Sequence, residues 1–189
     1  GTKGKIPIDA LVVTSIDRLL DAFIIKNIKK QYPQDFLLTE ESYKATNNAK
    51  RLRQDSVWII DPIDGTLDFS RYLMGQTKEK RQLSFSISLA YAFKGVLQLG
   101  IVCAPLLDEI WIAEKGRGAW YKKGSSAWKR LRLKPKNKKN LVIAVNHHEK
   151  IRDTEINFLS DYSLTFPSSL AYRIAAVTSG NHNALISFR

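Results

Sequence analysis

The chain has 189 residues, 44% of them hydrophobic and 10% aromatic, which is ordinary for a globular protein with one sizeable core or two small ones. It lacks a run of about eighteen apolar residues and an apolar stretch near its N-terminus, so we expect no membrane span, no secretory signal and a cytoplasmic location. Thirty Lys and Arg against 18 Asp and Glu give a net charge of +12, which attracts polyanions such as nucleic acid or phosphorylated small molecules.

The first predicted element is an amphipathic helix over residues 14–33. Apolar residues recur there at helical spacing, and Pro33 ends the pattern. Thr14, followed three residues later by Asp17, fits a capping box. One interpretation of Asp17 is therefore a helix cap without any chemical role.

Acidic residues follow the next two predicted strands. Residues 35–38 predict a short strand that leads to Glu40 and Glu41. A polar loop over residues 41–56 then precedes an apolar strand over residues 57–60, and this strand runs into two further aspartates. The strand ends are therefore the first place to look for a functional site.

The sequence WIIDPIDGT, residues 58–66, places two carboxylates in what we predict to be a turn stiffened by proline. Like charges at this separation repel unless a positive charge lies between them. Mg²⁺ binds carboxylate, carbonyl and water oxygens, and Glu40, Asp61 and Asp64 provide such ligands. Because proline fixes φ at about −65°, the Ile63 carbonyl can point to the same side as the carboxylates.

The next two residues can bind an anion. Gly65 and Thr66 offer backbone N–H groups at the start of a predicted helical turn, where phosphate is stabilised. Metal ligands beside a phosphate position fit hydrolysis of a phosphate ester. Metal ions there polarise the phosphoryl oxygen, stabilise the leaving oxygen and lower the pKa of a water so that it can attack.

A run of strands separated by Gly, Pro and Lys-rich turns comes next, and it predicts an antiparallel meander. These strands cover residues 83–93, 95–105, 109–121 and 131–134. The segment 122–139 holds much of the positive charge. We interpret it as a solvated basic hairpin, with RNA binding as the less favoured alternative.

Strands and helices alternate from residue 140 onward, which predicts a second α/β unit with parallel strands. The strands cover residues 140–146, 163–166 and 183–187, and the helices cover residues 150–162 and 168–180. We therefore predict two tightly packed domains. Residues 1–139 form an N-terminal α+β metal-binding domain, and residues 140–189 form the start of a C-terminal α/β substrate domain.

Three motifs and their spacing resemble a known family. VVTSID, LLTEES and WIIDPIDGTLDF are similar to the N-terminal motifs of the inositol monophosphatase superfamily, which are Mg²⁺-dependent, lithium-sensitive phosphomonoesterases that include the bisphosphate nucleotidases. GIVCAPLLDEIWIAEKGRGAW and SSLAYRIAAVTSG extend the resemblance over nearly the whole chain. The resemblance implies an α/β class, a layered α/β/α/β/α sandwich with a truncated C-terminal part, and two or three Mg²⁺ ions in the complete protein.

The resemblance also implies roles for single residues. The metal ligands are Glu40, Asp61, Ile63 through its carbonyl, and Asp64. The catalytic residues are Asp17 and Thr66, which orient the attacking water, and Glu41 beside the ligands. The substrate-binding residues are Asp64, Gly65, Thr66, Ser168 and Ser169.

The chain departs from the family pattern at two places that matter for activity. It has no Trp-Asp pair, whose aspartate completes the second metal site of the family, so we expect these 189 residues alone to hold one metal and to be catalytically poor. Ser187 stands where inositol phosphatases place a glutamate for the ring hydroxyls, and serine is a weaker acceptor than a carboxylate. A doubly phosphorylated nucleotide suits the positive charge better.

Two functions from different classes stay open. The first is a Mg²⁺-dependent phosphatase acting on inositol monophosphate or a similar metabolite, on a 3′(2′),5′-bisphosphate nucleotide, or on a sugar bisphosphate. The second is a basic binding partner of RNA or transcription machinery, as in the extragenic-suppressor branch of the family. The crowded carboxylates favour the enzyme, because a pure binding module has no need of them. A homodimer is open, and nucleic acid is not the favoured partner.

Overall fold

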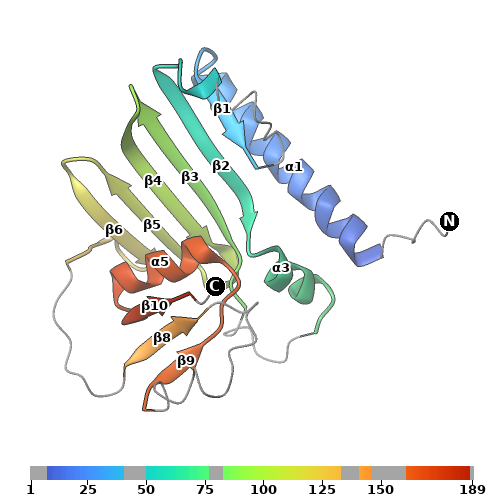
Figure 1. Ribbon diagram of the computed structural model, residues 1–189, viewed down its shortest axis with the longest axis vertical. Coiled ribbons are helices and arrows are strands. Elements are labelled where there is room, and N and C mark those ends of the chain that lie inside the picture. The colour runs from blue at the N-terminus through green and yellow to red at the C-terminus, as the bar shows by residue number, and fades with distance from the viewer. Residues whose placement is uncertain (1–7, 41–49, 77–82, 133–140, 146–160, 188–189) are drawn as a thin grey trace.

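The computed structural model describes residues 8–40, 50–76, 83–132, 141–145 and 161–187, with the backbone alone for residues 8–14. The helices are α1 (Ile8–Gln31), α3 (Thr66–Leu73), α5 (Leu170–Ser179) and a short 3-10 helix η2 (Pro105–Leu107). The strands are β1 (Phe36–Thr39), β2 (Ser56–Asp64), β3 (Ser86–Phe93), β4 (Val96–Ala104), β5 (Glu109–Glu114), β6 (Gly118–Lys123), β7 (Lys129–Arg130), β8 (Val142–Val145), β9 (Ser163–Thr165) and β10 (Ala184–Ile186). Figure 1 shows their arrangement.

The larger sheet has seven strands in chain order, from β1 to β7. β1 and β2 are parallel, and all the following pairs are antiparallel, which confirms the predicted meander. The single strand predicted over residues 109–121 is wrong, because a turn at residues 115–117 divides it into β5 and β6. The last strand lies at Lys129–Arg130, so its predicted position at residues 131–134 is wrong for residues 131 and 132, while residues 133 and 134 lie outside the described chain. The pairing of Tyr121 with Lys129 closes the hairpin earlier than the Leu-rich pattern indicated.

Helix α1 begins at Ile8, before the predicted start at residue 14. Thr14 and Asp17 therefore lie inside the helix, and the interpretation of Asp17 as an N-terminal cap is wrong. α1 packs against β2, and such tertiary packing determines the length of a helix more than a local capping signal does. The helix also holds the end of β1, because Thr39 Oγ1 donates to the buried Asp21 Oδ2 at 3.2 Å.

The smaller sheet has three parallel strands in the order β10-β8-β9, which confirms the predicted parallel α/β unit. Helix α5 ends at Gly180, as the sequence predicted. Residues 150–160 of the helix predicted over residues 150–162 lie outside the described chain, and residues 161 and 162 form a turn and a bend, so the prediction is wrong for these two. The division into domains near residue 140 stays a prediction.

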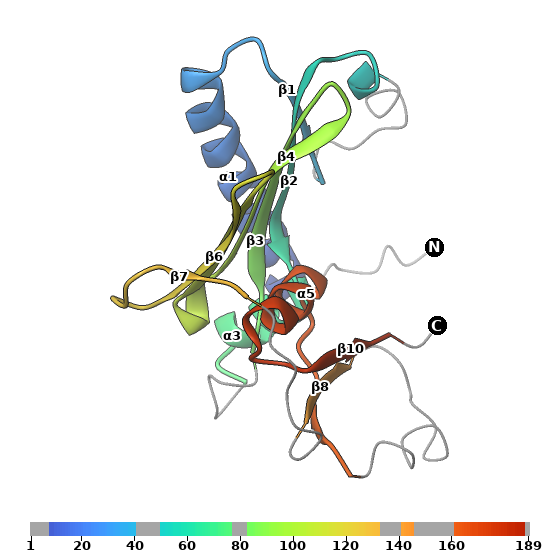
Figure 2. The ribbon, with the colours of Figure 1, turned by 90° about the vertical axis from the view of Figure 1, so that its left-hand side faces the viewer.

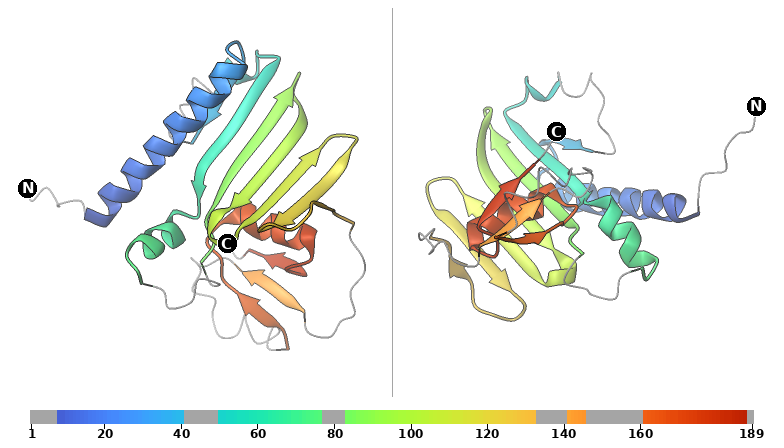
Figure 3. Two further views of the ribbon diagram at one scale, coloured as in Figure 1. Left: turned by 180° about the vertical axis from the view of Figure 1, so that it is seen from behind. Right: turned by 60° about the horizontal axis from the view of Figure 1, so that its bottom comes forward.

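The elements are arranged in layers. Figure 3 shows α1 running alongside β2, and Figure 2 shows α1 and α5 on opposite sides of the large sheet. α5 contacts β3 and β4 of the large sheet and β10 of the small one. The order helix, sheet, helix, sheet confirms the expected layered α/β class. No helix of the described chain is both long and apolar enough to cross a bilayer.

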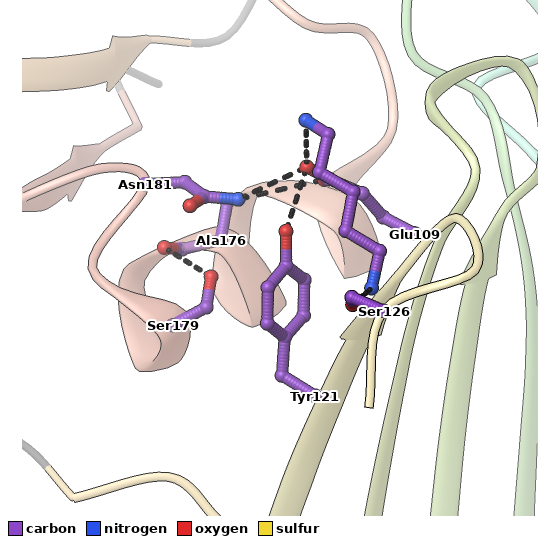
Figure 4. A network of polar contacts seen from close by, with 7 residues as sticks. Glu109, Tyr121, Ser126, Ala176, Ser179 and Asn181 are labelled. Atoms are coloured by element: carbon purple, nitrogen blue, oxygen red, sulfur yellow. Dashed lines mark hydrogen bonds and ion pairs between the residues drawn. The ribbon is translucent and has the colours of Figure 1, made fainter. Parts of the chain in front are cut away.

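A buried carboxylate fixes the C-terminal end of α5. Glu109 is 3% exposed and accepts hydrogen bonds from Tyr121 Oη at 2.9 Å, Lys123 Nζ at 2.8 Å and Asn181 Nδ2 at 3.3 Å. Figure 4 shows Tyr121 and Asn181 converging on Glu109 from the sheet and from the end of the helix. Buried charges are tolerated when they are paired, so these donors explain how Glu109 joins the large sheet to α5.

An apolar groove of about 790 Å³ lies on the α5 side of the large sheet. Its lining includes Ile59 and Ala90 of the sheet and Ile174 of α5, and Ile174 is 52% exposed. Glu40 and Asp61 also line it. The groove therefore reaches the predicted metal ligands.

Candidate functional site

The sequence Asp-Pro-Ile-Asp forms the end of strand β2. The strand runs to Asp64, and its pairing with β3 shifts register between Asp61 and Asp64. The prediction of a turn here is wrong, because the irregularity absorbs the proline, which has no N–H for the ladder, and keeps the chain extended. Ile63 N donates to Asp61 Oδ1 at 3.1 Å and fixes the carboxylate at this irregularity.

Asp61 lies among other negative charges. Burial, the charges of Glu40 and Asp64, and a hydrogen bond with the Glu40 side chain together raise the pKa of Asp61 to about 7. Two carboxyl groups share a hydrogen bond only when one of them holds a proton. A divalent cation relieves the same repulsion, so hard oxygen donors at this position fit Mg²⁺.

The predicted ligands are not gathered into a preformed cluster. Within the described residues, no three His, Cys, Asp or Glu side chains form a group that could hold a metal ion. Glu40 directly follows β1 and is exposed, whereas Asp64 Oδ2 is held at the start of α5 by Ser169 Oγ (2.7 Å) and Ala171 N (2.6 Å). Glu41 lies outside the described chain.

Thr66 begins helix α3 and is exposed to solvent. Its Oγ1 donates to the Ile63 carbonyl oxygen at 3.3 Å. Asp17 lies half-buried on α1, and α1 contacts α3. The pairing of Asp17 with Thr66 around a water, and the Ile63 carbonyl as a metal ligand, stay predictions.

Gly65 lies where two segments distant in sequence meet. Its φ is +92°, and a Cβ atom there would lie 2.9 Å from Ser169 N and 3.0 Å from Ser84 O. Real Cβ atoms essentially never approach backbone atoms that closely. Glycine is therefore required both by the left-handed conformation and by the close approach of the loop before α5.

Asp68 holds this junction together, and its role was not predicted from the sequence. Asp68 is 1% exposed, and its Oδ2 accepts from Ser84 N and Ser168 N, each at 3.0 Å. The sequence carried one signal, an acidic residue in the first turn of a helix, but this pattern usually reflects the helix dipole alone. The structure shows Asp68 joining α3 to the loop before α5.

Ser168 and Ser169, the predicted substrate contacts, lie at the same junction. Ser168 Oγ donates to Gly65 O at 3.2 Å. Ser169 is 0% exposed, and its hydroxyl contacts Asp64 Oδ2, Ser86 Oγ and Tyr172 N. The structure thus brings both serines to Asp64 and Gly65, while their contact with substrate stays a prediction.

The raised pKa of Asp61 predicts how the stability of the metal-free protein depends on pH. The pKa is about 7 in the folded state and near the ordinary 3.8 in the unfolded state, so between these values the folded state holds an extra proton. The contribution of Asp61 is fully present below the lower pKa and is lost as the pH rises through the upper one. Urea unfolding of EDTA-treated protein at several pH values measures it.

Asp61→Asn is the reference for that experiment, because other carboxylates also titrate. We expect wild type to lose stability relative to Asp61→Asn as the pH rises between the two pKa values. A saturating divalent cation should remove this difference in slope. A difference that stays flat, or that has the opposite sign, would contradict the crowding of Asp61.

Helices and sheets in alternating layers, with acidic residues at the end of β2, define an α/β protein of a layered phosphatase fold. The model of the inositol monophosphatase family matches residues 5–189. The chain belongs to this family.

The chain resembles relatives named as phosphatases and relatives named as Nus factors. The fructose-1,6-bisphosphatase/inositol-1-monophosphatase of Thermotoga maritima is 39% identical over 110 residues, covering 58% of this chain and 37% of the relative. The Nus factor SuhB of Escherichia coli K12 is 36% identical over 107 residues, covering 57% of this chain and 35% of the relative. The solved Thermotoga maritima IMPase has a TM-score of 0.70 and 29% identity, over 92% of this chain and 61% of its own. The chain thus spans between 35% and 61% of the length of these relatives.

Proposed function

We propose that this chain carries the catalytic core of a Mg²⁺-dependent phosphomonoesterase that acts on a small phosphorylated metabolite. The match of the family over residues 5–189 carries the proposal, and the pKa of Asp61, raised by burial and by Glu40 and Asp64, supports it. Crowded carboxylates raise the free energy of a metal-free site, and a divalent cation offsets that cost. Family membership and a relative named as a bisphosphatase and monophosphatase support the same chemistry.

Each part of the site has a task in this proposal. Glu40, Asp61 and the Ile63 carbonyl hold the first cation, and Asp64 takes part in a second. A bound Mg²⁺ polarises the phosphoryl oxygen and lowers the pKa of a water. The start of α3 binds the phosphate through its first backbone N–H groups, since the N-cap residue Gly65 has no side chain to bond to them. Asp68 N is already used, because it donates to Ser168 Oγ at 3.3 Å. Four further properties stay predictions: Mg²⁺ as the metal ion, inhibition by lithium, a cytoplasmic location and a homodimer.

A phosphate-release screen of the full-length protein with Mg²⁺ tests the proposal. The substrates are inositol 1-phosphate, 3′-phosphoadenosine 5′-phosphate and fructose 1,6-bisphosphate, each measured with and without EDTA. We expect release that depends on Mg²⁺, with preference for the nucleotide because of the net charge of +12 and Ser187. Absence of EDTA-sensitive release from all three would argue against a phosphatase.

Replacing Thr66 by alanine should lower kcat much more than it raises KM. If Thr66 orients the attacking water, its contribution is made mainly in the transition state, so kcat and kcat/KM fall together. General-base-type positioning of this kind contributes about 100-fold or more. Thr66→Ser keeps the hydroxyl and serves as the control. Steady-state kinetics that show only a raised KM in Thr66→Ala would assign Thr66 to binding instead.

A second candidate is a basic partner of RNA or of the transcription machinery. It is favoured by a relative named Nus factor SuhB and by the exposed cationic side chains of Lys129, Arg130 and Arg132. Binding of this kind depends on salt and needs no carboxylates. Gel-shift titration with RNA separates the two functions: Lys129→Glu with Arg130→Glu should abolish RNA binding and spare phosphate release, whereas Asp61→Asn should do the reverse.

A further inference from the structure

Asp64 uses one of its carboxylate oxygens to hold the start of α5. Oδ2 accepts a hydrogen bond from Ser169 Oγ at 2.7 Å and another from Ala171 N at 2.6 Å. A carboxylate oxygen has two lone pairs, so these donors use both lone pairs of Oδ2. Oδ1 is the oxygen that these contacts leave for a cation.

The position of the Ser169 proton follows from the partners of its hydroxyl. Tyr172 N, at 2.9 Å, can only donate to Ser169 Oγ, and an ionised Asp64 can only accept. Ser169 therefore gives its single proton to Asp64. Ser86 Oγ, 2.8 Å from Ser169 Oγ, must then be a donor. A directed chain of hydrogen bonds thus runs from Ser86 through Ser169 to Asp64, and both serines are fully buried.

We propose that Ser169 is a positioning residue that holds Asp64 with Oδ1 toward the metal site. This role replaces a direct contact of Ser169 with substrate. A hydroxyl that donates once and accepts twice has no capacity left for a ligand. The proposal rests on the proposed function, because it takes Asp64 to be a metal ligand.

The same contact links cation binding to the position of α5. Asp64 ends β2, whereas Ser169 caps α5, which contacts both sheets. The other end of α5 is fixed through Asn181 and Glu109. A shift of α5 would therefore move both donors of Asp64 Oδ2. A cation at Asp64 favours the docked helix, and the docked helix favours the cation by the same factor.

Calorimetric titration with Mn²⁺ tests this role directly. Asp64→Asn measures how much of the binding depends on Asp64. We expect Ser169→Ala to weaken Mn²⁺ binding in the same way, by about 10- to 100-fold, as happens when a group that orients a metal ligand is removed. Ser169→Thr keeps the hydroxyl and should restore the affinity.

Ser86→Ala is the matched control. It removes a buried hydroxyl from the same chain of hydrogen bonds and leaves both donors to Asp64 in place. Its Mn²⁺ affinity should equal that of wild type. Ser169→Gly guards against loss of the helix cap, because glycine is nearly as good an N-cap. Circular dichroism melts without metal verify that each variant folds.

The outcomes separate the two proposals. Wild-type affinity in Ser169→Ala and Ser169→Gly, beside a loss in Asp64→Asn, would overturn the role of Ser169 and leave the proposed function standing. An equal loss in Ser86→Ala would also overturn it, because the effect would then come from the buried network in general. Unchanged binding in Asp64→Asn, or no binding by wild type, would overturn both proposals.

Discussion

Asp61→Asn should abolish phosphate release while the metal-free protein stays folded and, above neutral pH, becomes more stable. Burial, Glu40 and Asp64 together raise the pKa of Asp61. Removing its charge takes away a shared ligand and also relieves repulsion. Because bound metal supplies several kcal/mol of transition-state stabilisation, kcat should fall by at least about 100-fold.

Asp55→Asn is the matched control for this change. Asp55 is exposed, immediately before β2, and the substitution removes the same charge far along the strand from the site. Its kcat and its urea midpoint should match those of wild type. Glu40→Gln should repeat the loss of turnover with a smaller gain in stability, because Glu40 is more exposed than Asp61. Normal turnover in Asp61→Asn would exclude Asp61 from the metal site.

Among the glycines that the structure describes, Gly65 should tolerate replacement by alanine least. A left-handed φ of +92° costs an alanine about 1–2 kcal/mol, and the Cβ atom would also collide with backbone at Ser169 and Ser84. Backbone cannot yield as a flexible side chain does, so overpacking adds about 1–3 kcal/mol. The collision would also push α5 away from Asp64, and phosphate release should be lost with the stability.

Gly95→Ala separates the two causes. Gly95 also has a positive φ, +74°, but a Cβ atom there would meet nothing within 4 Å. It should therefore show only the conformational cost and leave phosphate release unchanged. Urea unfolding and phosphate release of the two variants provide the comparison. Equal stability losses would show that the loop before α5 does not press on Gly65.

The predictions from sequence were most accurate where a signal is local. The strands of the meander and the glycine that ends α5 have their cause within a few residues, in alternating apolar side chains and in a left-handed cap. The start of α1 was wrong because a capping pattern does not by itself end a helix, and α1 continues past Thr14 back to Ile8. The turn at Asp61 was wrong because an irregular strand can absorb a proline.

The candidate site shows the same difference between local signals, which the sequence carries, and contacts that only the fold creates. Glu40, Asp61 and Asp64 could be proposed from their types and spacing, since acids crowded at strand ends repel one another and so indicate a cation. Asp68 could not, because its role depends on Ser168, 100 residues away in the chain. No period or motif signals a hydrogen bond over that separation. Only the fold brings these side chains together.

The open groove beside α5 affects how all these variants can be measured. Environment-sensitive dyes that fluoresce on apolar surfaces should bind along Ile59 and Ile174 while the protein is still folded. In a dye-based melting curve the folded protein would then already fluoresce strongly, and this signal would hide the unfolding transition. Trp111 lines the groove and is itself buried, so quenching of its emission by energy transfer would report the bound dye. The apolar surface that complicates one assay thus provides an optical probe of whatever covers it.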